Sequence, residues 1–400
     1  MSPYTILIGL SLAVILSYLF DLAARATKVP SVLLLLLAGI GFNQAVTYWN
    51  IPFHLPSVLL QILGIVGLIL IVLEGSLDLR LTRDKIPVIR RSFLAAALML
   101  LVQAGAIAGL LHLYVAGASW QSCLANAVPL AVISSAVAIP SVAGLTGQKQ
   151  EFIIYESTFS DIMGIMLFNF ALQEDFAQGV SVITFGRDVL AILVVAVVST
   201  VALAFLLGRL RGHIKFFLLF AFLVLMYSLA KKYHLSSLVL VLVFGLAVNN
   251  ADLFLRGPRL QRWLHPDQLA SELAQLKSLT AESAFLVRTF FFLAFGFSIT
   301  LANLISGNLL LQGLLIVAVL TLIRFLYLKY IARTDLIPEL FIAPKGLITV
   351  LLFYSIPDHL HLGEISENIL SMVILLTGLL MMFGLQLSHR NAIGLLQNEE

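Results

Sequence analysis

Two carboxylates lie close together in an apolar part of the sequence. Glu156 and Asp161 belong to the stretch 151–169, whose flanks are apolar enough for a membrane interior. A charged group at the centre of a bilayer costs about 2.5–3.5 kcal/mol on insertion scales, so two on one helix need a chemical reason. At about 100° per residue they point roughly 140° apart, which predicts different neighbours and different roles.

Hydroxyl groups accompany the second carboxylate. On a helix, Ser157 and Thr158 lie on the Asp161 face, whereas Ser160 falls on the Glu156 side. A buried carboxyl group without a fixed counter-charge must hold a proton or a small cation, because burial penalises an unpaired charge. The two occupants compete for the same oxygens, which is the chemistry of cation/proton exchange. Hard oxygen ligands suit Na⁺, K⁺ or Li⁺.

Lys345 and Arg288 are the basic residues that we place well inside apolar segments. We expect Lys345 to pair with Glu156, since pairing offsets the cost of burying each charge. Asp161 is then left for the mobile ion. Arg288 either joins this network or extends its head to the membrane boundary.

Composition excludes an ordinary soluble protein. Hydrophobic residues make up 60% and charged residues 11% of the 400, whereas globular chains are about 25% charged. Apolar segments of about 20 residues recur along the chain, so we expect one polytopic helical membrane domain over residues 1–400. We do not expect this domain to be an enzyme. The single cysteine, Cys123, allows no internal disulfide or cysteine-based metal cluster. We expect no cofactor and no nucleic-acid partner.

Hydropathy predicts about thirteen transmembrane helices. Loops after odd-numbered spans hold most of the Lys and Arg residues, which places the N-terminus outside and the C-terminus in the cytoplasm. The longest loop, 252–280, carries leucines at helical spacing and predicts a short amphipathic helix. The predicted spans lie near 3–23, 30–49, 56–78, 87–116, 123–146, 151–173, 181–208, 215–231, 235–251, 281–303, 307–331, 337–356 and 366–388.

The fifth and twelfth spans contain proline among small or polar residues. Pro140 and Pro344 each remove an intrahelical hydrogen bond and favour an unwound stretch. Such backbone survives at membrane depth only where it is buried in protein or lines a wet cavity. Ser134 and Ser135 supply hydroxyls near the first break. The odd offset between these spans, shared by the Gly-Ser ends of the third and tenth, indicates inverted repeats of the kind found in transporters.

At these positions the chain resembles the monovalent cation/proton antiporters, the sodium/proton exchanger superfamily. Glu156-Ser157-x-x-Ser160-Asp161 is similar to that family's Glu-Ser-x-x-Asn-Asp signature. Ala343-Pro344-Lys345-Gly346 is similar to its later motif, in which a basic residue precedes Gly on a broken helix. The ends of the third and tenth spans also match its patterns. The resemblance covers essentially the whole chain.

The resemblance implies an NhaA-type fold with thirteen helices, inverted repeats and two broken, crossing helices. Spans three to six and ten to thirteen would form the ion-transport core of a homodimer, which serves pH homeostasis in a bacterial inner membrane. If the residues that match the family motifs have the family's roles, Asp161 holds the ion or proton, and Glu156 with Lys345 is the structural pair. The candidate coordinating residues are Ser134, Ser135 and Ser160, beside Ser157 and Thr158.

The chain departs from the family pattern at Ser160, where the family usually has Asn or a second Asp. With a single carrier acid we expect electroneutral exchange of Na⁺, or alternatively K⁺, for H⁺ by alternating access. Lys345 in place of Arg leaves a second titrating site open. Two other functions remain alternatives: a sodium-coupled symporter of an organic anion, and a non-transporting membrane sensor or scaffold.

Overall fold

The structure of the protein is a computed structural model. It describes residues 3–27, 29–50, 57–78, 83–142, 147–173, 216–232, 237–250, 266–299, 307–333, 336–363 and 367–397, with a few isolated residues between 145 and 198. Every regular element within these ranges is helical. The seventh predicted span, 181–208, and the first half of the predicted 252–280 loop lie almost entirely outside the described residues.

Seven segments within the described residues are long and apolar enough to cross a membrane. They are Leu7–Ala24, Ser31–Tyr48, Ile86–Tyr114, Trp120–Ser141, Ala274–Ser298, Leu309–Ala332 and Glu367–Ser388. Shorter apolar helices lie at Ile62–Leu77, Phe220–Ala230 and Ser237–Asn249. All of them overlap predicted spans, so the chain is an all-helical, multi-pass membrane protein.

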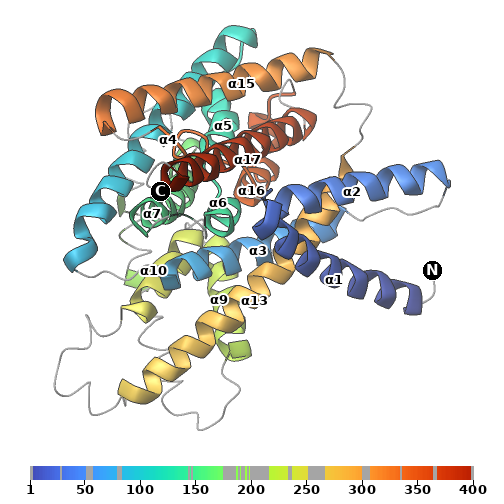
Figure 1. Ribbon diagram of the computed structural model, residues 1–400, viewed down its shortest axis with the longest axis vertical. Helices are drawn as coiled ribbons and strands as arrows, with labels where there is room; N and C mark the ends of the chain where they lie inside the picture. The colour runs from blue at the N-terminus through green and yellow to red at the C-terminus, as the bar shows by residue number, and fades with distance from the viewer. Residues whose placement is uncertain are drawn as a thin grey trace.

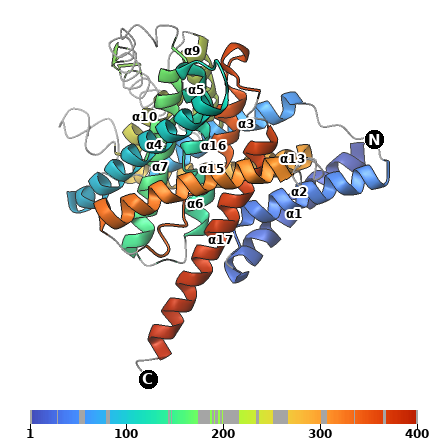
Figure 2. The same ribbon diagram turned by 90° about the horizontal axis from the view of Figure 1, so that it is seen from above.

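The helices pack into two groups with one helix between them (Figures 1 and 2). The α13 bundle comprises α1 (Pro3–Thr27), α2 (Ser31–Tyr48), α3 (Ser57–Asp78), α9 (Phe216–Lys232), α10 (Ser237–Asn249) and α13 (Pro266–Ser298). The α7 bundle comprises α4 (Ile86–Tyr114), α5 (Trp120–Ala131), α6 (Ser135–Ser141), α7 (Gly147–Ala171), α15 (Gly307–Leu326) and α17 (Glu367–Gln397). Between them, α16 (Leu347–Tyr354) packs against α3 and α5.

Short elements complete the described chain. They are the 3₁₀ turns Arg83–Lys85 and Asp358–Leu360 and the π-helical turn Tyr327–Ala332. In Figure 2, α17 extends beyond both bundles to the C-terminus. The sequence grouped the third and tenth spans with the acidic helix in an ion-transport core, and that division stays a prediction. In the described structure α3 and α13 pack against each other, against α2 and against α10.

Glycines allow α2 and α13 to cross closely. A β-carbon on Gly39 would lie 2.4 Å from the carbonyl oxygen of Leu293, and one on Gly296 would lie 2.4 Å from that of Leu36. Small residues at such crossings let helix backbones approach in lipid, where no hydrophobic effect drives the helices together. The close packing of α2 against α13 stabilises the centre of the α13 bundle.

The amphipathic helix predicted in the long loop is not a separate element. The first part of α13 occupies this position, and the helix runs unbroken from Pro266 to Ser298. No Gly or Pro occurs between 267 and 295, so nothing in the sequence ends the helix before the membrane. Leu276 is buried, but Leu279, which should lie on the same apolar face, is 42% exposed, so only part of the predicted face is covered.

Both predicted breaks are present, although one is displaced. The first occupies residues 132–134 between α5 and α6, and Pro140 lies inside α6 instead of at the break. The second occupies residues 342–346, which include Pro344, and turns precede it where the sequence predicted helix. The two extended segments meet, because the Ser134 N–H donates to the Pro344 carbonyl at 2.9 Å.

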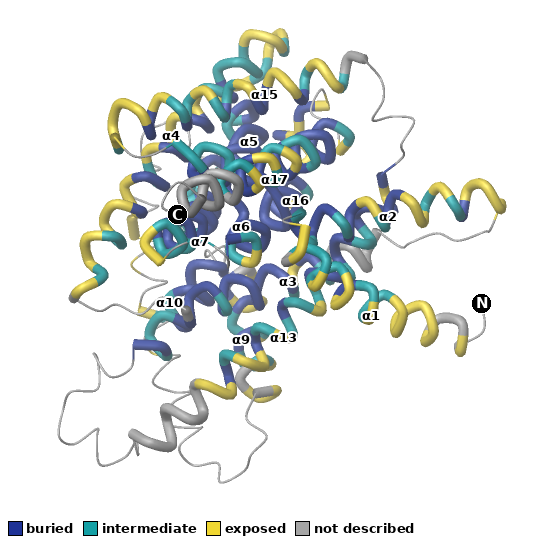
Figure 3. Tube along the Cα trace, in the orientation of Figure 1, coloured by how far each residue is buried: buried dark blue, intermediate teal, exposed yellow. Residues whose placement is uncertain are grey.

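Burial is greatest around these breaks (Figure 3). In an apolar 18-residue window of the broken segment Trp120–Ser141, 89% of the residues are buried, whereas 6% of the residues in Leu7–Ala24 of α1 are buried. Apolar side chains on α1, α4 and α15 face outward, as lipid-facing residues do. The unwound backbone is therefore enclosed by protein, which is the condition under which it can exist at membrane depth.

Candidate ion-binding site

α7 carries both predicted acids into the protein interior. Glu156 is 1% exposed and Asp161 is 5% exposed. Their angular separation on the helix directs them to different partners, as the sequence predicts. Glu156 meets α15, whereas Asp161 meets the first break.

Asp161 is bonded through only one of its two carboxyl oxygens. Its Oδ2 accepts a hydrogen bond from the Ser135 N–H at 3.1 Å and another from the Ser135 hydroxyl. Its Oδ1 is buried and has no hydrogen-bond partner among the described residues. Ser135, a candidate coordinating residue from the sequence, thus contacts Asp161, and one carboxyl oxygen is left to accept a further positive group.

The first break leaves backbone groups that α7 and the second break satisfy. In a continuous helix the Ser135 N–H would bond the carbonyl of Ala131, four residues earlier. Instead this N–H binds Asp161, and the Ala131 carbonyl accepts from the Lys345 Nζ at 2.8 Å. The Ile133 N–H donates to the Ser160 hydroxyl at 2.9 Å. Unwinding thus exposes the donors that hold the carboxylate.

Lys345 stabilises the crossing of the two breaks. It is buried, its N–H donates to the Thr377 hydroxyl at 3.1 Å, and its ammonium group binds the Ala131 carbonyl. The predicted ion pair with Glu156 is wrong: in the described part of the chain the Glu156 carboxylate binds a different base. The positive charge of Lys345 lies against a free helix C-terminus, where the carbonyl dipoles favour a cation.

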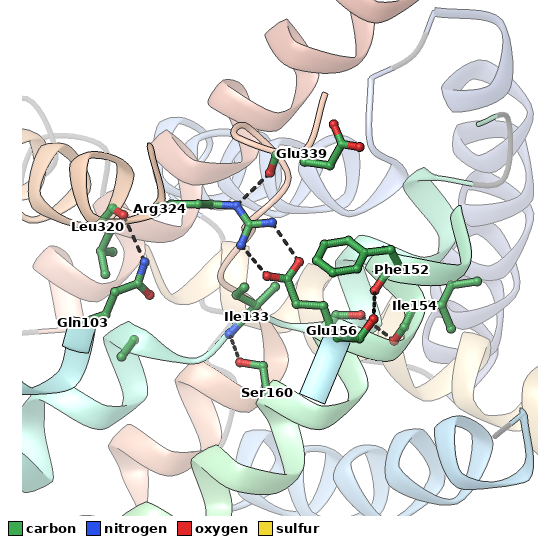
Figure 4. Close-up of polar contacts among 12 residues, drawn as sticks. Gln103, Ile133, Phe152, Ile154, Glu156, Ser160, Leu320, Arg324 and Glu339 are labelled. Carbon is green, nitrogen blue, oxygen red and sulfur yellow. Dashed lines mark hydrogen bonds and ion pairs between the residues drawn. The ribbon is translucent and has the colours of Figure 1, made fainter. Parts of the chain in front are cut away.

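Arg324 of α15 is the true partner of Glu156 (Figure 4). Nη1 and Nη2 each lie 2.8 Å from one oxygen of Glu156, and Nε donates to the Glu339 carbonyl at 2.7 Å. Arg324 is 1% exposed. A planar guanidinium matches a carboxylate in two parallel hydrogen bonds, which a lysine ammonium group does not. The pair joins α7, α15 and the segment before the second break.

Sequence reasoning missed Arg324 although a signal was present. The residue lies inside the predicted span 307–331, with eight apolar or Thr residues directly before it from Ile316 to Ile323. A lone arginine in such a run must find a buried acid, because the isolated charge is too costly. The position of Lys345 at a break favours it as the partner of Glu156 when the sequence alone is considered.

The remaining predicted hydroxyl residues fall into two classes. The hydroxyls of Ser157 and Thr158 donate to the Ile154 carbonyl of their own helix, at 3.2 and 2.8 Å. The Thr158 methyl group faces Gly75 of α3. The Ser134 hydroxyl is buried and has no hydrogen-bond partner among the described residues.

Arg288 is buried between the two bundles and binds polar groups on both sides. It is 8% exposed, Nη2 lies 3.4 Å from the Glu74 carboxylate, and Nη1 donates to the Ala136 carbonyl of α6 at 2.9 Å. Both membrane bases named from the sequence therefore bind carbonyl oxygens of the first broken helix. Neither of them is within ion-pair distance of Asp161 in the described structure.

The geometry gives the two acids different chemistry. Glu156 and Arg324 form a closed, neutral pair. Asp161 has a fixed donor set on one oxygen and an open position on the other, beside a break that also contributes the unpartnered Ser134 hydroxyl. These oxygens fit a proton or a dehydrated alkali cation.

The fold matches solved transporter structures. Two structures of the sodium proton antiporter MjNhaP1 from Methanocaldococcus jannaschii are similar to this chain. The structure at pH 8 has a TM-score of 0.66 at 20% identity and covers 96% of this chain and 99% of its own. The electron-microscopy map has a TM-score of 0.69 at 19% identity, with 96% of each chain covered. At these identities the likeness shows the fold.

Comparison of the sequence with family models gives one family. No curated protein matches the chain in sequence. The model described as the sodium/hydrogen exchanger, transmembrane, matches residues 10–388, which is nearly the whole chain. The protein belongs to the sodium/hydrogen exchanger family.

Proposed function

We propose that the protein exchanges Na⁺ for H⁺ across a membrane and that Asp161 is the group the two ions share. The observation that carries this proposal is the half-bonded carboxylate: Ser135 fixes Oδ2, and Oδ1 is buried without a partner. A buried carboxylate needs a positive charge or a proton. Either ion supplies it, and both cannot occupy the same oxygen comfortably.

Charge counting supports electroneutral exchange. The charges of Glu156 and Arg324 cancel in a bidentate pair that neither ion needs to open. Ser160, where the family usually has Asn or a second acid, adds no charge. One Na⁺ replaces one H⁺ on Asp161, so the charge of the loaded site is the same in both directions. K⁺ remains the alternative cation.

The site also supports transport by alternating access. A loaded, neutral carboxyl group can move through an apolar boundary, whereas the bare carboxylate is held back by its charge. In this scheme Ser134, Ser135 and Ser160 line or support the ion position. Ser157 and Thr158 lie one helical turn before Asp161. The exchange needs no cofactor. A carboxylate that is bonded through one oxygen beside crossing breaks fits the broken-helix sites of inverted-repeat transporters.

The wider architecture follows as part of the proposal. We infer an NhaA-type fold with thirteen helices, in a homodimer of the bacterial inner membrane, with the N-terminus outside and the C-terminus in the cytoplasm. The concentration of Lys and Arg in alternate loops supports this orientation. Cation/proton exchange in that membrane would serve pH homeostasis.

Exchange in proteoliposomes tests the proposal. A pH-sensitive dye inside the vesicles should report proton movement when Na⁺ is added outside, with Li⁺ and K⁺ compared at equal ionic strength. Clamping the membrane potential at several values should leave the rate unchanged if exchange is electroneutral. No cation-dependent proton movement from folded, reconstituted protein would contradict exchange, and voltage-dependent rates would contradict the one-for-one count.

A further inference from the structure

We propose that the hydrogen bond from Arg288 to the Ala136 carbonyl holds the two bundles in register and that its release limits how fast the α7 bundle reorients. We call it the cross-bundle contact. It joins α13, in one bundle, to α6, in the other, at 2.9 Å. The inference rests on the alternating-access exchange proposed above, and it assigns Arg288 a role as a positioning residue.

Pro140 creates the acceptor for this contact. In an α-helix the N–H of residue 140 would donate to the carbonyl of residue 136. Proline has no N–H, so the Ala136 carbonyl loses its intrahelical donor at a buried position. A buried carbonyl without a donor is costly, and the Arg288 Nη1 supplies the missing hydrogen bond from the neighbouring bundle.

Arg288 is fixed on its own side of the boundary and keeps unused donors. Its Nη2 lies 3.4 Å from the carboxylate of Glu74 on α3, which belongs to the same bundle as α13. Its Nε is buried and has no hydrogen-bond partner among the described residues. The guanidinium is therefore anchored by Glu74 and can let go of α6 without leaving its own bundle.

The rest of the boundary near α3 is built for movement. Gly64, Gly67 and Gly75 lie on one face of α3, because their spacings of three and eleven residues return close to the same angle. β-Carbons added at Gly64 and Gly75 would meet Leu351 and Thr158, and one added at Gly67 would meet Val287 of α13 and then Leu347. A glycine face against apolar groups offers close packing with few specific contacts. On a surface with few other specific contacts, the charged hydrogen bond from Arg288 contributes much of the preference for one relative position of the two bundles.

The cross-bundle contact is also directly connected to the ion site. Ala136 follows Ser135, whose N–H and hydroxyl hold Asp161. A pocket of about 190 Å³ at the boundary is lined by Arg288, Pro140, Glu74 and other residues. A space of this size admits water, so water can replace Arg288 on the carbonyl when the bundles part.

Two variants remove the contact in different ways. Pro140→Ala restores the N–H of residue 140 and gives the Ala136 carbonyl a donor within its own helix, while every charge is retained. Arg288→Gln removes the cross-bundle donor, and Arg288→Lys retains the charge but loses the planar donor set. Pro129→Ala is the matched control, because Pro129 also lies inside a half of the same broken helix, α5.

Transport rates give the first readout. The contact stabilises the conformation from which the α7 bundle reorients, so it must break during the slow step. Pro140→Ala and Arg288→Gln should therefore raise the maximal exchange rate by roughly three- to tenfold, with the apparent KM for Na⁺ changed by less than about twofold. Arg288→Lys should lie between wild type and Arg288→Gln. The double variant should equal the faster single variant, since both changes remove one contact.

Spin-label distances give a readout that does not need transport. Labels at Leu37→Cys on α2 and Leu379→Cys on α17, in a Cys123→Ser background, occupy exposed positions in the two bundles. Pro140→Ala should move part of the distance distribution away from the wild-type peak, and Pro129→Ala should leave it unchanged. Unchanged distances and rates in both Pro140→Ala and Arg288→Gln, with an exchanging wild type, would overturn the inference. A silent wild type would instead count against the exchange proposal, while the distances would still decide the role of the contact.

Discussion

The two acids of α7 are equally buried but differently bonded. Glu156 has a bidentate partner in Arg324, with both oxygens at 2.8 Å. Asp161, one and a half turns later, has its bonds on Oδ2 only, and all of them come from Ser135. A group whose hydrogen bonds are complete is held in place, whereas a group with an open oxygen can change its partner. The difference separates a structural acid from a carrier acid on a single helix.

The local backbone explains why the two acids differ. Glu156 faces α15, a regular helix that offers a fixed side chain. Asp161 faces Ser135 at the end of the break over residues 132–134, where the interrupted helix leaves the Ser135 N–H without an intrahelical acceptor. Side chains bring their own charge and can neutralise an acid, but a backbone N–H is only a dipole and leaves the charge of a carboxylate uncompensated. The compensation must come from a mobile ion.

The largest expected effect is from Asp161→Asn. Asparagine is similar in size but cannot exchange a proton for a cation, so Na⁺-driven proton movement in proteoliposomes should fall to the level of empty vesicles. The elution profile and thermal midpoint of the purified protein should stay close to wild type. The matched control is Asp358→Asn, the same change at an exposed position, which should exchange at the wild-type rate. Exchange by the Asp161 variant would remove the distinction between the two acids.

Glu156→Gln should act on stability. It leaves the buried Arg324 without its counter-charge, and breaking a buried pair costs about 3–5 kcal/mol. We expect a large drop in the thermal midpoint, measured by the loss of monodisperse protein on heating. Arg324→Gln should do the same, and the double variant should be more stable than either single one. Single variants as stable as wild type would show that this pair is not structural.

Ser135→Ala should have an intermediate effect, on ion affinity. It removes one hydrogen bond to a carboxylate, which is about 1.5–3 kcal/mol, and the Ser135 N–H remains. The apparent affinity for Na⁺ should fall by about ten- to a hundredfold. Ser141→Ala is the control on the same helix, since its hydroxyl donates only to the Val137 carbonyl of α6. Equal effects of the two changes would argue against a specific role for Ser135.

The smallest effect is expected at an exposed ion pair. Lys85 Nζ lies 2.8 Å from Glu151, the same distance as in the buried pair, but the two side chains are 36% and 38% exposed. The hydrogen bond to Glu151 raises the pKa of Lys85 above its usual value. Lys85 therefore keeps its charge at neutral pH, and its contribution to the pair is lost as the pH rises through that pKa. Lys85→Ala should cost less than about 1 kcal/mol in a denaturant titration, and a cost like that of Glu156→Gln would contradict the contrast.

The sequence predicted the parts of the site that depend on local pattern. Glu156, Asp161 and the breaks are visible as polar and proline residues in apolar runs, and helical angles separated the roles of the two acids. The partner of Glu156 depends on which helices are neighbours, and sequence spacing does not contain that information. The sequence favours Lys345 as the partner of Glu156 because it lies at a break. In the structure, α15 places Arg324 beside Glu156.

The position of the first break also required the structure. Proline inside a helix removes one hydrogen bond, and Pro140 keeps its place in α6 because Arg288 binds the freed carbonyl. The extended backbone lies at 132–134 instead, where Asp161, Ser160 and Pro344 satisfy the free N–H groups. Since Pro129 also lies inside its helix, α5, the proline positions alone do not locate the break.

Proton release on cation binding tests the central claim most directly. Purified protein in weakly buffered detergent, at a pH where Asp161 holds a proton, is titrated with NaCl and with choline chloride as the control. Wild type should release about one proton for each Na⁺ bound, since the two ligands are linked through one group, and folded Asp161→Asn should release none. Equal proton release from wild type and the folded Asp161→Asn variant would show that the exchange of ions takes place on another group.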